Sequence, residues 1–243
     1  MPPTVILVRH AQALHNVENK SPDFPLSFLF CNILTNIYHK TTISMIQIPK
    51  DFDVGLIIVS PSIRTIETAL LAFGDLIEKG VPIVAHAGWQ ENSLQPCDTG
   101  TALPTLATLF PQVDFRPVDP LYPDKTSAAA APVYGYTRQA IVSRGQTVLR
   151  ELRARPEKAV VVVSHSGFLR AGVTGRYFMN ADFRVFEFLP EGEGDGLRLW
   201  EGMEAGGMGW SWDRVVPLGE GLSDAEGGVD GVVDGVGEVV DGA

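Results

Sequence analysis

The sequence predicts an α/β fold, a three-layer α/β/α domain built around a mostly parallel central sheet. Short apolar runs alternate along the chain with segments of helical pattern, as in proteins that build a sheet from strand–helix units. The apolar runs are continuous, which indicates strands buried on both faces, as the strands of parallel sheets are. A chain of 243 residues is long enough to bury a core without disulfides or a metal.

Each element of this fold is predicted from a local pattern. Four buried strands are expected at residues 5–8, 56–60, 81–85 and 160–164. Helices are expected at residues 62–78, 103–109, 134–154 and 168–179. Two later segments alternate apolar and polar residues and predict antiparallel strands at 183–189 and 197–200.

The chain is predicted to form one domain, residues 1–216, followed by a tail. Residues 217–243 are rich in Gly, Asp and Val, and they hold seven acidic residues but no Lys or Arg. This composition disfavours both helix and strand, so disorder is expected there. Subtracting the seven charges from the net charge of −10 leaves −3 for the domain, which allows a local basic pocket.

Composition also bears on partners and location. The net negative charge argues against nucleic acid, and the lack of an apolar run of about 18 residues argues against a membrane span. The two cysteines, Cys31 and Cys97, lie far apart, and no secretory signal is visible. These observations predict a cytoplasmic protein whose partner is a small molecule.

One segment, residues 24–48, differs in composition from the rest. It is rich in Ile, Asn, Thr and Phe and has neither a helical nor an alternating period. It fits a lid or an extra hairpin, and it equally fits a gene-model artefact such as a translated intron. The sequence leaves these alternatives open.

Polar side chains follow the predicted parallel strands at the point where each strand ends. Five of them carry chemistry: Arg9, His10, Arg64, Glu91 and His165. In an open α/β sheet, ligands bind beyond the carboxyl ends of the strands, so these groups are expected to converge on one edge.

This set of side chains suits phosphoryl transfer. Guanidinium groups match the geometry of a phosphomonoester through paired, charge-assisted hydrogen bonds. A neutral histidine can attack phosphorus, and a protonated carboxylic acid can donate to the leaving alcohol. No metal or cofactor is required by this chemistry, and no metal-ligand spacing is visible.

Four motifs resemble those of the histidine phosphatase superfamily, which includes the phosphoglycerate mutases. They are VRHAQALHN, SPSIRTIETA, WQENSLQPCDTG and VVSHSGFLR; they occur in the family's order and span residues 5–170. The third is similar to the acid-bearing loop of fungal-type members. The resemblance implies a phosphoglycerate mutase-like fold.

The resemblance also implies a role for each matching residue. His10 is implied as the nucleophile, which forms a transient phosphohistidine, and Glu91 as the proton donor. The implied ligands of the phosphoryl group are Arg9, Asn16, Arg64 and His165. The chain departs from the family pattern at Ala11 and Ser166, where glycine is usual, and it lacks the family's L-T-x-x-G turn after Asn16.

Ser166 offers a rival interpretation, the nucleophile of an α/β-hydrolase. Those enzymes place their triad in the order Ser, acid, His, and no histidine follows Ser166 in this chain. The sequence therefore favours a metal-independent phosphomonoesterase. Two alternatives stay open: a phosphoglycerate mutase-type phosphoryl transfer, and a catalytically silent phosphate-binding protein.

Overall fold

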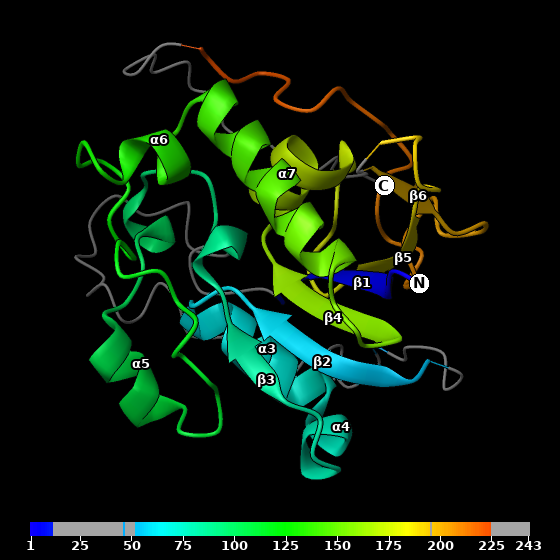
Figure 1. Cartoon of the computed structure of the whole chain (residues 1–243), viewed down its shortest axis with the longest axis horizontal. Helices are drawn as coiled ribbons and strands as arrows, with labels where there is room; N and C mark the ends of the chain where they lie inside the picture. Colours follow the sequence, from blue (N-terminus) through cyan, green and yellow to red (C-terminus); the bar gives the residue numbers. More distant parts are fainter. Residues whose placement is uncertain (12–45, 47–51, 195, 225–243) are drawn as a thin grey trace, which may run out of the picture.

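A single sheet forms the centre of the molecule (Figure 1). The computed structural model describes residues 1–11, 46, 52–194 and 196–224. Within this part the strand order is β3-β2-β4-β1-β5-β6. The strands are β1 (Thr4–Arg9), β2 (Val54–Val59), β3 (Ile83–Ala85), β4 (Ala159–Ser164), β5 (Phe183–Phe188) and β6 (Leu197–Leu199).

The pairing of these strands confirms a mostly parallel sheet. Strands β3, β2, β4 and β1 run parallel to one another, whereas β5 pairs antiparallel with β1, and β6 antiparallel with β5. The two later strands were predicted as antiparallel from their alternation. Strand β4 lies between β1 and β2, so segments far apart in the chain are neighbours at the centre of the sheet.

Helices cover both faces of the sheet. They are α3 (Ile63–Ala72), α4 (Gly74–Glu78), α5 (Leu103–Leu109), α6 (Ala131–Tyr134), α7 (Arg138–Arg153) and α8 (Ser166–Phe168), with short turns η2 (Ala87–Trp89) and η3 (Pro96–Asp98) and the π-helix η4 (Leu169–Thr174). Ile6 and Val8 of β1 join one core cluster with residues of α3 and α5. Val5 and Leu7 join a second cluster, with residues of α7 and η4. This alternation of buried side chains produces the predicted three layers.

Several helices of the structure begin or end at other residues than predicted. The helix expected at 62–78 is divided into α3 and α4. The helix expected at 134–154 begins at Arg138, because the side chain of Thr137 caps it by accepting from the amide of Ala140 at 3.2 Å. The helix expected at 168–179 begins as α8, continues as η4 and ends before Gly175, whose φ of 69° is left-handed.

The predicted tail begins with residues that are packed on the domain. The amide of Gly219 donates to the carbonyl of Ala171 at 2.8 Å, and the carbonyl of Ser223 accepts from the amide of Arg138 at 2.9 Å. Leu222 packs against the second core cluster. The boundary predicted at residue 216 is therefore too early, because backbone hydrogen bonds and one apolar contact hold residues 217–224; the rest of the tail lies outside the described residues.

Two other predictions fall outside the described part of the chain. Asn16 lies there, and so does the atypical segment 24–48 except for Ile46, which is buried in the first core cluster. In the part that is described, no helix is long and apolar enough to cross a membrane.

Candidate active site

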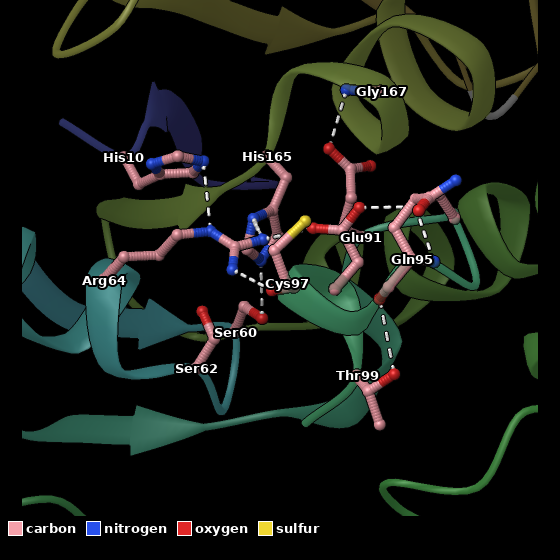
Figure 2. Close-up of polar contacts among 12 residues, drawn as sticks. His10, Ser60, Ser62, Arg64, Glu91, Gln95, Cys97, Thr99, His165 and Gly167 are labelled. Atoms are coloured by element: carbon pink, nitrogen blue, oxygen red, sulfur yellow. Dashed lines mark hydrogen bonds and ion pairs between the residues drawn. The ribbon is translucent and has the colours of Figure 1, made fainter. Parts of the chain in front are cut away.

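The centre of the site lies at the carboxyl ends of three neighbouring strands. His10 follows β1, Ser60 follows β2 and His165 follows β4. The ladders continue one residue past the strands, since the amides of His10 and Ser60 donate to the carbonyls of Ser164 and Val163 at 3.0 Å. Because β4 lies between β1 and β2, these side chains meet at one edge of the sheet (Figure 2).

The hydrogen bonds of His10 assign its tautomer. Nδ1 lies 2.6 Å from the carbonyl oxygen of Ala11, and a carbonyl only accepts, so Nδ1 carries the proton. Nε2 therefore holds the lone pair, which accepts from Nε of Arg64 at 3.2 Å. The imidazole is held neutral in this arrangement, with its nucleophilic nitrogen facing a guanidinium group.

His165 lies beside His10 and is oriented by two partners. Its Nδ1 lies 2.9 Å from a terminal nitrogen of Arg64, and its Nε2 lies 2.9 Å from Oγ of Ser60. Arg64 only donates, so Nδ1 accepts and Nε2 donates to the serine hydroxyl. The ring centroids of the two histidines are 5.1 Å apart, edge to face.

Arg64 connects the two histidines to the loop that precedes α5. It lies in the first turn of α3 and is completely enclosed, with an exposed fraction of 1%. Besides the two imidazoles, it donates to the carbonyl of Cys97 at 2.6 Å and to the carboxylate of Asp98 at 2.7 Å. A buried guanidinium with four acceptors has its N–H directions fixed before any ligand arrives.

Glu91 is the last of the predicted site residues that the structure brings to this edge of the sheet. It follows β3 and η2, and its carboxylate accepts from the amides of Gly167 at 3.1 Å, Phe168 at 2.8 Å and Asn92 at 2.8 Å. A Cβ at Gly167 would lie 2.6 Å from Oε1 of Glu91, so glycine at this position permits the approach. In the sequence motif SHSG, Gly167 therefore leaves room for the carboxylate of Glu91, and His165 contributes its imidazole to the site.

The surroundings of Glu91 favour its protonated form. Burial raises the pKa of the carboxyl, and the negative charge of Asp98 raises this pKa further. The backbone amides of Asn92 and Gly167 and the charge of Arg64 act in the opposite direction. The raised pKa suits a group that must carry a proton to a leaving alcohol.

A hollow joins these groups. Its lining includes Ser60, Arg64, Gln90, Glu91, Asp98 and His165. Cys97 and Tyr122 also line it. Four of the six predicted site residues thus come together, because His10 reaches the same centre through Arg64.

The other predicted residues lie differently. Arg9, at the end of β1, donates to the carbonyl of Phe178 at 2.7 Å, and its contact with a phosphoryl group stays a prediction. Asn16 is outside the described residues. Ser166 Oγ donates to the same carbonyl of Phe178 at 3.4 Å and is absent from the lining of the hollow.

Sequence reasoning missed two charged residues of the site. Asp98 pairs with Arg64, and Lys125 is buried and donates to three carbonyls of the segment that carries Glu91 and Asp98. Asp98 stands in the quoted motif WQENSLQPCDTG, seven residues after Glu91, which was the available signal. No sequence signal marks Lys125, because it follows α5 in a loop without a motif.

The raised pKa of Glu91 has a consequence for stability. A carboxyl with a raised pKa in the folded state contributes stability below its unfolded value of 4.5, and this contribution is lost as pH rises through the raised value. Gln cannot ionise, so we expect the free energy of unfolding of Glu91→Gln to rise relative to that of the wild type between pH 4.5 and neutrality. Urea unfolding at both pH values measures the difference; a difference independent of pH would contradict the raised pKa.

Comparison with known proteins identifies the family. Residues 5–186 match the family model described as the histidine phosphatase superfamily (branch 1). A phosphoglycerate mutase-like protein of Arabidopsis thaliana is 29% identical over 205 residues, which cover 68% of this chain and 72% of that protein. Phosphoglycerate mutase-like protein 1 of the same plant is 28% identical over 198 residues, covering 68% and 69%.

Solved structures that are similar to this chain include a phosphoserine phosphatase of Entamoeba histolytica in complex with 3-phosphoglyceric acid. It is 18% identical, with a TM-score of 0.45, and the match covers 81% of this chain and 94% of that one. A phosphoglycerate mutase of Bacillus anthracis is 14% identical, with a TM-score of 0.49 and coverages of 82% and 91%.

Proposed function

Because the chain belongs to the histidine phosphatase superfamily, we propose that it is a phosphomonoester hydrolase that works through a phosphohistidine at His10. One observation carries the proposal. The guanidinium of Arg64 donates both to Nε2 of His10 and to Nδ1 of His165, so the anion-binding donors are gathered at the nucleophilic nitrogen. A phosphoryl group at this point accepts the same N–H groups in place of the imidazoles.

In the first half of the reaction, Nε2 of His10 attacks phosphorus. The new N–P bond forms as the ester P–O bond breaks, and Glu91 gives its proton to the departing alcohol. Arg64 stabilises the charge on the phosphoryl oxygens as the bonds change. Glu91 is left as a carboxylate, stabilised by the amides of Gly167, Phe168 and Asn92.

In the second half, water replaces the alcohol. The carboxylate of Glu91 takes a proton from the water as its oxygen attacks phosphorus, and the N–P bond breaks. The products are inorganic phosphate, neutral His10 and protonated Glu91, which restores the starting state. The residues of the site supply all of these groups, so no metal is needed for either half.

The test is phosphate release from p-nitrophenyl phosphate by the purified chain in the presence of EDTA. We expect steady turnover. Binding of phosphate without turnover would instead identify a silent phosphate-binding protein. Phosphoglycerate isomerisation that depends on a bisphosphoglycerate primer would identify a mutase. Three measurements on one preparation, of phosphate release, phosphate binding and phosphoglycerate isomerisation, separate these outcomes.

Replacement of Glu91 by Gln tests the proton donor. Alkyl phosphates need a proton on the leaving oxygen, whereas p-nitrophenolate leaves without one. We expect Glu91→Gln to lower kcat/KM, which reports the steps up to formation of the phosphohistidine, by about 100-fold or more for an alkyl phosphate, with a much smaller loss in kcat/KM for p-nitrophenyl phosphate. Glu78→Gln, an exposed glutamate at the end of α4, is the matched control. Equal losses on both substrates would count against Glu91 as the acid.

A further inference from the structure

Lys125 is a buried lysine whose ammonium has a complete set of hydrogen bonds. Its exposed fraction is 5%. Nζ donates to the carbonyl oxygens of Glu91 at 2.8 Å, Ser93 at 2.9 Å and Asp98 at 2.9 Å. An ammonium has three N–H donors, so each of them is used.

The three acceptors belong to one short segment, residues 91–98, which we call the acid loop. This loop carries Glu91 at one end and Asp98 at the other. Asp98 in turn holds Arg64 at 2.7 Å, and its second oxygen accepts from the hydroxyl of Ser93. Through the acid loop, Lys125 thus reaches both the proton donor and the guanidinium at the nucleophile, without contacting the reacting atoms.

Burial makes this arrangement costly. It lowers the pKa of Lys125 to about 8, against the attraction of Asp98 and Glu91, while Arg144 and Arg64 lower it further. The arrangement has a geometrical consequence, because one cation satisfies three carbonyl groups spread along the loop from residue 91 to residue 98. A methionine of similar length fills the space but leaves all three carbonyl oxygens without this partner.

We propose that Lys125 is a positioning residue, which fixes the acid loop so that the carboxyl of Glu91 and the Arg64–Asp98 pair are held at the distances that the reaction requires. The inference rests on the proposed function. It assigns Lys125 no contact with substrate. Displacement of a catalytic group by about 1 Å can lower the rate by about 100-fold, which is the scale of the expected effect.

The test compares Lys125→Met with Lys158→Met, a matched control whose lysine is exposed and paired with Asp53 at the surface. We expect kcat/KM for an alkyl phosphate to fall by about 100-fold in Lys125→Met, and kcat/KM for p-nitrophenyl phosphate to fall much less, because in the steps up to the phosphohistidine only the alkyl leaving group needs the acid. Lys125→Gln retains two N–H donors, so we expect a smaller loss, and this variant serves if Lys125→Met folds poorly.

A second measurement is independent of turnover. Hydrogen exchange followed by mass spectrometry should show faster exchange in peptides that cover the acid loop of Lys125→Met, and unchanged exchange in strands β1, β2 and β4. Faster exchange confined to the loop, together with the substrate-dependent loss, supports the inference.

Two results would overturn it, and a third bears on the proposed function alone. Equal loss on both substrates with faster exchange throughout the fold indicates a merely structural lysine. Unchanged turnover and unchanged exchange indicate that the loop holds its geometry without Lys125. Absence of hydrolysis by the wild-type chain rejects the proposed function itself, and the exchange data then still decide whether Lys125 holds the loop.

Discussion

The variant His10→Ala is expected to lose phosphatase activity entirely within the limit of detection, for alkyl and aryl phosphates alike. The physical reason is that, in the described part of the chain, His10 is the residue proposed to attack phosphorus. Its Nδ1 is bound to the carbonyl of Ala11, which leaves Nε2 as the attacking atom. His165 is oriented differently, since its Nδ1 accepts from Arg64 and its Nε2 is directed at Ser60.

The measurement pairs turnover with trapping of the intermediate. Rapid quenching of the wild type with labelled substrate should yield a protein-bound phosphate that is labile in acid and stable in alkali, as phosphoramidates are. His10→Ala should yield none while still binding inorganic phosphate through Arg64. Labelled protein from the variant would place the nucleophile elsewhere, and loss of phosphate binding would show that the substitution disturbed the whole site.

Arg64→Lys is expected to produce the second largest loss. A lysine keeps the charge but concentrates it at one nitrogen, so it cannot reach both imidazoles, the Cys97 carbonyl and Asp98 at the same time. Removal of a single preorganised donor typically lowers kcat by about 100- to 1000-fold, and Arg64 presents several donors. We therefore expect a loss of about 1000-fold or more in kcat/KM.

The control is Arg116→Lys, since Arg116 is exposed and forms a surface pair with Asp114. Thermal unfolding of both variants separates the two effects of the change in Arg64. The partly buried carboxylate of Asp98 loses its geometrically matched partner, so some stability is lost as well. A variant that folds with near wild-type stability and retains wild-type kcat/KM would show that the phosphoryl group is held by other residues.

The sequence was sufficient to predict which side chains meet. His10, Arg64, Glu91 and His165 each follow a predicted strand, and the rule that ligands bind beyond the carboxyl ends of parallel strands brought them together without knowledge of the strand order. Continuous apolar runs predicted four strands of the described sheet, and alternation of apolar and polar residues predicted the other two. These features depend on local patterns, which one sequence contains.

The partners of those side chains could not be predicted. Arg64 is held by Asp98, and the acid loop is held by Lys125, because α3, η3 and the loop after α5 pack against one another in three dimensions. No spacing in the sequence encodes that packing. The same limit explains the tail, where Leu222 and the amide of Gly219 are ordered by contacts with a distant helix despite an acidic, glycine-rich composition.

The position of β1 between β4 and β5 has a consequence for biosynthesis. The two strands that pair with β1 begin at residues 159 and 183, so a nascent chain leaves the ribosome with its first strand unpaired. The interior of that strand, Val5 to Val8, is wholly apolar and completely buried in the finished fold. An unpaired apolar strand of this kind favours association with other chains until β4 and β5 have been synthesised and can pair with it. His10 is thus synthesised long before β4 and β5, the pocket around it closes only after both of these strands have emerged, and chaperones that shield apolar segments are expected to engage β1 in the interval.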